Sequence, residues 1–180
     1  RKLASLHWDA GERDRSFECL ERALALVEDR PTSVHKAHIL GSLSRNLMLA
    51  GDTEATIQLG GQAIAMMEEL GGDEEGRAFV LNNIGSARVQ AGDAGGLDDL
   101  EQSVAISEAI NSADIARGYG NLASLVTDLG QLGRRAELLE KGVAAAKRFG
   151  LADDRLWLGS ELLWQPYWEG SWDEASRGLD

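Results

Sequence analysis

The chain has 180 residues, and its 43% hydrophobic and 27% charged residues exclude wholesale disorder. Its 30 acidic and 18 basic side chains give a formal net charge of −12, which disfavours binding to nucleic acid or to an anionic membrane. No apolar run approaches the roughly 18–20 residues of a membrane-spanning helix, and a single cysteine, Cys19, fits a reducing compartment. We therefore expect a cytoplasmic protein.

The predicted elements are all helices. Apolar residues recur at three- and four-residue steps, as in residues 77–91 and 97–110, and no segment alternates long enough to predict a strand. Pro166 should kink the helix that contains it. In chain order we predict helices at 1–10, 13–29, 33–50, 53–70, 74–91, 95–110, 113–129, 133–149, 153–169 and 172–180.

The helices form pairs that repeat about every 40 residues. Two independent ladders of equivalent positions keep this spacing along the chain. The first is made of glycines that close an apolar stretch: Gly11, Gly51, Gly92, Gly130 and Gly170. The second runs through the apolar residues Leu24, Ile64, Val104 and Val143. Two ladders that stay in step indicate a true repeat.

Glycine is abundant, with 21 residues, and many of these glycines lie inside predicted helices. A glycine there costs up to about 1 kcal/mol relative to alanine. We expect the missing Cβ to let neighbouring helices approach closely. The internal glycines are Gly41, Gly60, Gly61, Gly85, Gly118, Gly120, Gly142 and Gly159.

The motifs within the units resemble the tetratricopeptide repeat (TPR), whose first helix carries an Asn-Leu-Gly core and ends in Gly-Asp. Asn83-Ile84-Gly85 is followed by Gly92-Asp93, and Asn121-Leu122-Ala123 is followed by Gly130. The resemblance covers essentially the whole chain and implies an all-α fold, a right-handed α-solenoid of about four and a half repeats and roughly ten helices. The units are longer than the tetratricopeptide unit of about 34 residues. The proline that usually lies between repeats is present only as Pro31.

Units of this length are similar to the helical-repeat regions of large bacterial signalling proteins, such as ATP-binding LuxR-type transcription regulators and some adenylyl cyclases. We expect residues 1–180 to form one TPR-like domain. We also expect this domain to be a fragment of a longer protein, truncated at both ends.

The resemblance places the binding surface on the concave face built by the first helices of the repeats. The residues that it implies there are His38, Arg45, Asn82, Asn83, Ser86, Arg117, Asn121, Ser124, Trp157 and Trp164. For Asn83 and Asn121 there is an alternative, which is that their amides bond to neighbouring backbone and maintain the shape of the repeat.

Aromatic residues are concentrated near the end of the chain. Four of the five tryptophans, together with Tyr167, fall within sixteen residues; these are Trp157, Trp164, Trp168 and Trp172. One interpretation is a binding hot spot, where tryptophan and tyrosine are enriched. The other is a core that packs against a further repeat beyond Asp180.

Catalytic motifs are absent from the sequence. The segment Gly118-Tyr-Gly120-Asn-Leu-Ala123 matches a dinucleotide-binding pattern, but it lies within a predicted helix and lacks the required strand. His35 and His38 can share a helix face, but no third metal ligand accompanies them. We expect no catalytic, cofactor or metal site.

The expected function is therefore that of a non-catalytic scaffold within a larger bacterial regulator. Its concave groove would bind a peptide or a partner domain, or mediate self-association. The alternative is an effector-sensing domain that binds a small molecule, and an enzyme is the least favoured class. We expect no nucleic acid or membrane partner for this segment.

Overall fold

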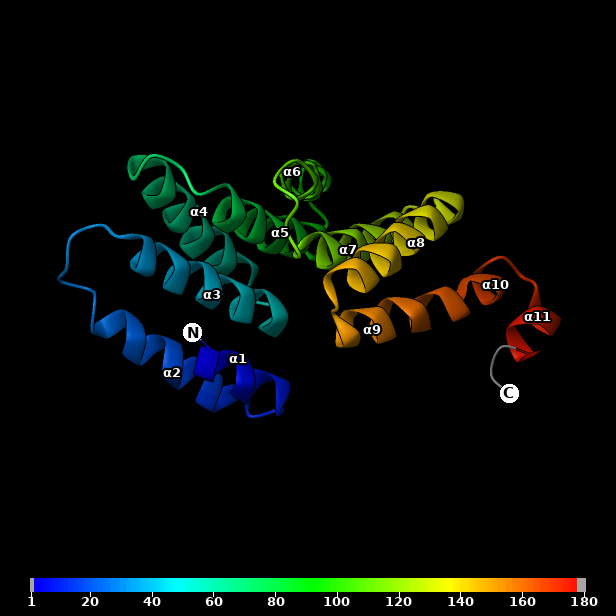
Figure 1. Ribbon diagram of the computed structural model, residues 1–180, viewed down its shortest axis with the longest axis horizontal. Helices are drawn as coiled ribbons and strands as arrows, with labels where there is room; N and C mark the ends of the chain where they lie inside the picture. Colours follow the sequence, from blue (N-terminus) through cyan, green and yellow to red (C-terminus); the bar gives the residue numbers. More distant parts are fainter. Residues whose placement is uncertain (1, 178–180) are drawn as a thin grey trace. The chain divides into compact units, whose positions relative to one another are not determined.

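The computed structural model describes residues 2–177, except the side chain of Ala175, and every regular element in this range is a helix (Figure 1). The helices are α1 (Lys2–Asp9), α2 (Arg13–Ala25), α3 (Val34–Ala50), α4 (Thr53–Glu69), α5 (Glu74–Gln90), α6 (Gly96–Ala109), α7 (Ile115–Asp128), α8 (Leu132–Phe149), α9 (Ala152–Leu163), α10 (Gln165–Trp168) and α11 (Trp172–Arg177). The predicted all-α fold class is confirmed. None of these helices is both long and apolar enough to cross a bilayer.

The glycine ladder marks the ends of the first helix of each pair. Its members follow α1, α3, α5, α7 and α10, and all of them adopt a left-handed backbone with φ between +71° and +82°. Glycine takes this conformation without the steric cost that a Cβ imposes. The first helices of the repeats are therefore α1, α3, α5, α7 and the α9–α10 segment, and the second helices are α2, α4, α6, α8 and α11.

The chain divides into two compact units, with the boundary after Ser103 inside α6. In the first unit, α3 packs against α2, α4 and α5, and α1 packs against α2. Two apolar clusters form its core. One contains Ala37, Leu40, Ala63, Met67, Val80 and Ile84; the other contains Ala4, Leu20, Ile39 and Leu43.

In the second unit, α7 packs against α8 and α9, α8 packs against α9 and α10, and α10 contacts α11. The predicted helix at 153–169 is divided at Trp164 into α9 and α10, with Pro166 in the first turn of α10. The predicted kink at this proline is thus confirmed. The helix predicted at 13–29 ends earlier, at Ala25, and the last three residues of the one predicted at 172–180 lie outside the described residues.

Several internal glycines lie where helices approach closely, as predicted. A Cβ on Gly41 of α3 would lie 2.9 Å from Cγ2 of Val80 in α5. At the equivalent position in the second unit, a Cβ on Gly120 of α7 would lie 2.3 Å from the Trp157 ring in α9. The prediction is wrong for Gly61 and Gly159, which have nothing within 4 Å, because both point into open space.

Candidate functional site

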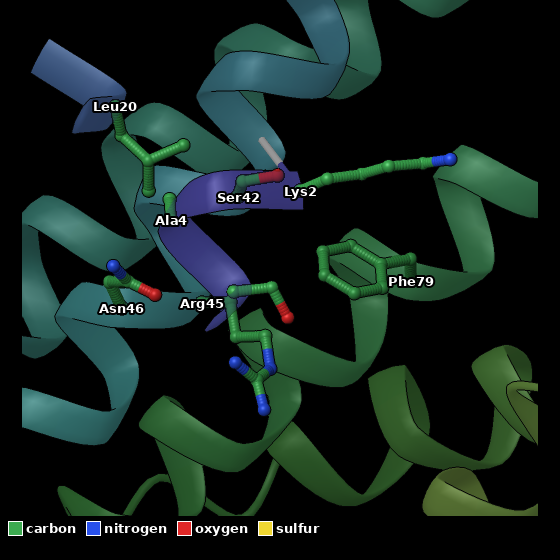
Figure 2. A pocket seen from close by; sticks show the side chains of 8 residues that line it. Lys2, Ala4, Leu20, Ser42, Arg45, Asn46 and Phe79 are labelled. Carbon is green, nitrogen blue, oxygen red and sulfur yellow. The ribbon is translucent and has the colours of Figure 1, made fainter. Parts of the chain in front are cut away.

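The candidate site is a cavity of about 600 Å³ in the first unit, between α1, α2, α3 and α5. Pockets that hold small ligands have volumes of about 300–1,000 Å³. We call it the Arg45 cavity (Figure 2). It is lined by Lys2, Ala4, Ser5, Leu20, Ser42, Arg45, Asn46 and Phe79.

The helical period explains how α3 supplies one wall of the cavity. Ser42, Arg45 and Asn46 are three and four residues apart, so they share one face of the helix. Phe79 comes from α5, the first helix of the next repeat, and Lys2 from α1, the first helix of the preceding one. Figure 2 shows the Phe79 ring on one side of the cavity, and Ala4 and Leu20 on the other. First helices therefore build most of the site.

The charge of the Arg45 cavity is opposite to that of the chain. Its described lining residues include two basic side chains and no Asp or Glu, although the chain carries a net charge of −12. Among the described residues, neither the half-buried Arg45 guanidinium nor the Lys2 ammonium makes a hydrogen bond or an ion pair. Two uncompensated cations beside an apolar ring favour an anionic ligand with an apolar portion.

A chain of hydrogen bonds fixes the wall of the cavity that contains Asn46 and Ala4. Asn46 is 4% exposed, and its Nδ2 donates to Ser16 Oγ at 2.9 Å. The Ser16 hydroxyl in turn donates to the Ala4 carbonyl at 2.8 Å. These bonds join α1, α2 and α3 and hold the Asn46 amide in one orientation. The polar wall is therefore formed before any ligand binds.

Two of the other four predicted site residues in the first unit, His38 and Asn83, make contacts within the repeat itself. His38 Nε2 lies 2.5 Å from Asp73 Oδ2, which joins α3 to the N-terminus of α5. Asn83 is fully buried and donates to the Gly41 carbonyl at 3.3 Å, so its amide bonds to neighbouring backbone, as the alternative interpretation held. Asn82 is buried, and the buried Ser86 hydroxyl has no hydrogen-bond partner among the residues that the structure describes. Among the predicted residues of this unit, only Arg45 lines the cavity.

The predicted residues of the second unit lie on α7 and α9. Arg117 and Asn121 are half-buried, and Ser124 is exposed, with its hydroxyl donating to the Gly120 carbonyl at 3.2 Å. The Trp157 ring packs over Gly120 and is 36% exposed. Trp164 is the C-cap residue that follows α9, and it is 49% exposed.

The clustered aromatic residues form an exposed, connected surface in the second unit. The Tyr167 ring makes edge-on contacts with Trp164, Trp168 and Trp172, with centroid distances of 5.8, 5.6 and 4.8 Å. Their exposed fractions range from 42% to 59%. We call these four residues the aromatic surface. An exposed cluster of this kind is typical of a contact surface, either for a partner or for a further repeat.

Sequence reasoning missed Lys2, Phe79 and Asn46 as lining residues. Phe79 follows Ala78 just as the predicted His38 follows Ala37, so the repeat position was a usable signal. Lys2 gave no such signal, because its place depends on how α1 packs.

The described residues contain neither a metal-binding group of side chains nor a dinucleotide-binding turn. No group of three or more His, Cys, Asp or Glu side chains among them is arranged to hold a metal ion. The Gly118-Tyr-Gly120 segment lies inside α7, so its glycines do not form the strand-to-helix turn that a dinucleotide needs.

Comparison with solved structures shows a TPR-like helical-repeat fold. A variant of a putative kinesin light chain of Podosopora anserina with nearly identical TPR-like repeats matches with a TM-score of 0.68 at 23% identity, over 99% of this chain and 88% of that one. A Rap protein complexed with Competence and Sporulation Factor matches with a TM-score of 0.86 at 14% identity, over 98% and 49%.

The third structure is a Signal Transduction ATPase with Numerous Domains protein with a tetratricopeptide repeat sensor, from Pyrococcus horikoshii. It matches with a TM-score of 0.74 at 13% identity, over 98% of this chain and 27% of that one. The chain thus spans about half of the Rap protein and about a quarter of the ATPase. No family model and no curated protein matches the sequence.

Proposed function

We propose that this chain is a non-catalytic interaction module that binds an acidic segment of a partner protein on its first helices. In the first unit the segment would enter the Arg45 cavity. The observation that carries the proposal is the Arg45 guanidinium, which has no hydrogen bond or ion pair among the described residues and lies in a cavity whose described lining contains no carboxylate. An anionic group there gains charge-assisted hydrogen bonds in surroundings that are partly shielded from water.

The apolar part of the lining adds a second requirement for the partner. Phe79, Leu20 and Ala4 offer an apolar surface next to the two cations. We therefore expect the bound segment to carry an aspartate or glutamate close to an apolar side chain. The Rap structure complexed with Competence and Sporulation Factor supports the proposal, because it is a protein of this fold with a bound factor.

The test is fluorescence anisotropy with labelled peptides in which an acidic and an apolar residue stand at varied spacing. Arg45→Gln should weaken the tightest of these complexes at least tenfold, since the charge-assisted bond is lost. Arg22→Gln is the matched control, because Arg22 is an exposed cation of the same unit, on α2 and outside the cavity. Equal affinities for the wild type and Arg45→Gln would contradict the proposal.

We further propose that the module belongs to a larger cytoplasmic regulator of bacterial type, related in design to the ATP-binding LuxR-type regulators. In that setting the alternative function is effector sensing. The similar ATPase, whose name includes a tetratricopeptide repeat sensor, favours this alternative. An ATPase segment and a DNA-binding segment encoded next to this one would support the regulator proposal, and a gene without either would oppose it.

A further inference from the structure

We propose a separate binding site in the second unit for a small amphipathic anion, meaning an aromatic or aliphatic body with one carboxylate or phosphate group. It is a cavity of about 490 Å³ between α6, α7 and α8, and we call it the Tyr119 cavity. It is lined by Ser107, Glu108, Asn111, Ser112, Ile115, Tyr119, Lys141, Ala144, Ala145, Arg148 and Phe149. The proposal does not depend on the partner segment assigned to the first unit.

The floor of the Tyr119 cavity is largely apolar. Tyr119 and Ile115 of α7 are 7% and 6% exposed, and Ala145 and Phe149 of α8 are half-buried. The Tyr119 hydroxyl donates to the Glu108 carboxylate. Burial, reinforced by this bond, raises the pKa of Tyr119 to about 12, so the phenol stays neutral at physiological pH. The floor thus presents a fixed ring and aliphatic side chains to a ligand body.

Two cations stand at the rim. Lys141 Nζ lies 5.9 Å from the centroid of the Tyr119 ring, and among the described residues it makes no hydrogen bond or ion pair. The Arg148 guanidinium lies 5.2 Å from the centroid of Phe149 and donates to Asn111 Oδ1, a neutral acceptor. Glu108 is the one carboxylate among the described lining residues, and it accepts the hydrogen bond from the Tyr119 hydroxyl. The cationic charge at the rim therefore exceeds the anionic charge.

The backbone turn at the end of α6 positions Asn111 in the lining of the cavity. Asn111 has φ of +55°, a left-handed conformation that asparagine tolerates better than most residues. The Ser112 amide N–H closes the helix end by donating to the Ser107 carbonyl at 2.9 Å. This turn places the Asn111 side chain where it meets Arg148 across the cavity.

Size and charge together define the ligand class. A volume of about 490 Å³ falls within the range of about 300–1,000 Å³ found for small-molecule sites. The apolar floor selects against a purely polar ion such as inorganic phosphate, whereas the rim selects for a negative group. Phenyl phosphate combines both features and is the probe of choice.

Isothermal titration calorimetry of the full chain with phenyl phosphate tests the proposal. We expect saturable binding at one site and at least tenfold weaker binding of inorganic phosphate. Lys141→Gln should lower the affinity for phenyl phosphate at least tenfold. Lys147 is an exposed cation of α8 that does not line this cavity, so Lys147→Gln should leave the affinity unchanged. The affinity for phenyl phosphate should also be unchanged in Arg45→Gln, because Arg45 lines the cavity of the first unit and not the Tyr119 cavity.

Ala145→Leu fills the Tyr119 cavity without removing charge, and it should abolish binding while circular dichroism stays that of the wild type. If that variant fails to fold, Ala144→Leu serves the same purpose, because Ala144 lines the cavity from a more exposed position. Absence of saturable binding to the wild type overturns the proposal. So does binding that survives the filled cavity, or binding that is lost in Arg45→Gln and kept in Lys141→Gln.

Discussion

The guanidinium of Arg135 donates to the carboxylate of Glu161, with 2.8 Å between Nη2 and Oε2. Arg135 is 2% exposed, and it also donates to the Gln165 side-chain oxygen at 2.7 Å and the Glu161 carbonyl at 3.0 Å. Gln165 in turn donates to the Leu132 carbonyl at 3.1 Å. One buried arginine of α8 thus donates hydrogen bonds to Glu161 and Gln165 at the junction between α9 and α10.

Replacing Arg135 by methionine should therefore destabilise the second unit. The change leaves the Gln165 side-chain oxygen without its Arg135 donor, and it removes one donor from the Glu161 carbonyl, which still accepts from the Trp164 N–H. A buried group that loses its partner costs about 1–3 kcal/mol. Urea unfolding followed by tryptophan fluorescence measures the loss, with Lys147→Met on the same helix as the exposed control. Equal stability of the two variants would contradict this account of the kink.

Two glycines on facing helices predict opposite results for the same substitution. Gly120→Ala places a Cβ 2.3 Å from the Trp157 ring and should lower the unfolding free energy by about 1–3 kcal/mol, as overpacking does. Gly159→Ala meets open space in α9 and should raise it by up to about 1 kcal/mol, because alanine is the better helix former. Thermal melts of both variants and the wild type measure these changes. A Gly120→Ala variant as stable as the wild type would refute the close α7–α9 contact.

The aromatic surface should contribute little to the stability of this chain. Trp164 is 49% exposed, so Trp164→Ala should cost less than Leu158→Ala. Leu158 is fully buried, and its truncation should cost about 2–5 kcal/mol. Chemical unfolding of the two variants side by side is the measurement. A loss for Trp164→Ala that equals the loss for Leu158→Ala would mean that the aromatic surface is already part of the core.

Alkaline pH should destabilise the second unit through Tyr119. Its pKa is raised to about 12, so the folded chain keeps a proton that the unfolded chain releases near pH 10. The stabilisation is fully present below pH 10 and should fall by about 1.4 kcal/mol per pH unit between roughly pH 10 and 12. The wild type should lose more stability over this range than Tyr119→Phe. Identical pH dependence in the two proteins would refute the assignment to Tyr119.

The repeat could be predicted from the sequence because the residues that end its helices act locally. A glycine that ends a helix needs a left-handed backbone wherever the helix lies, so Gly51 and Gly92 marked true helix ends. The resemblance to the tetratricopeptide repeat implied that Arg45 lies on the surface built by the first helices, and Arg45 lines the Arg45 cavity from α3. The helix ends required only the spacing of the units, whereas the position of Arg45 required the resemblance.

Features that depend on tertiary packing were not readable. Lys2 joins the Arg45 cavity only because α1 packs near α3, and nothing in the spacing of the chain indicates that position. Arg135 looks like an ordinary exposed cation near the start of a helix, yet the kink between α9 and α10 buries it. Gly159 shows the converse, because its internal position suggested a close contact that the structure does not contain.

The central claim is that Arg45 binds an acidic group of the partner segment, and a charge swap tests it most directly. Anisotropy titrations would compare the tightest acidic peptide with the same peptide carrying lysine at the acidic position, against the wild type and Arg45→Glu. We predict that Arg45→Glu loses the acidic peptide and binds the lysine peptide more tightly than the wild type does. If Arg45→Glu keeps the wild-type preference for the acidic peptide, the Arg45 cavity is not the binding site.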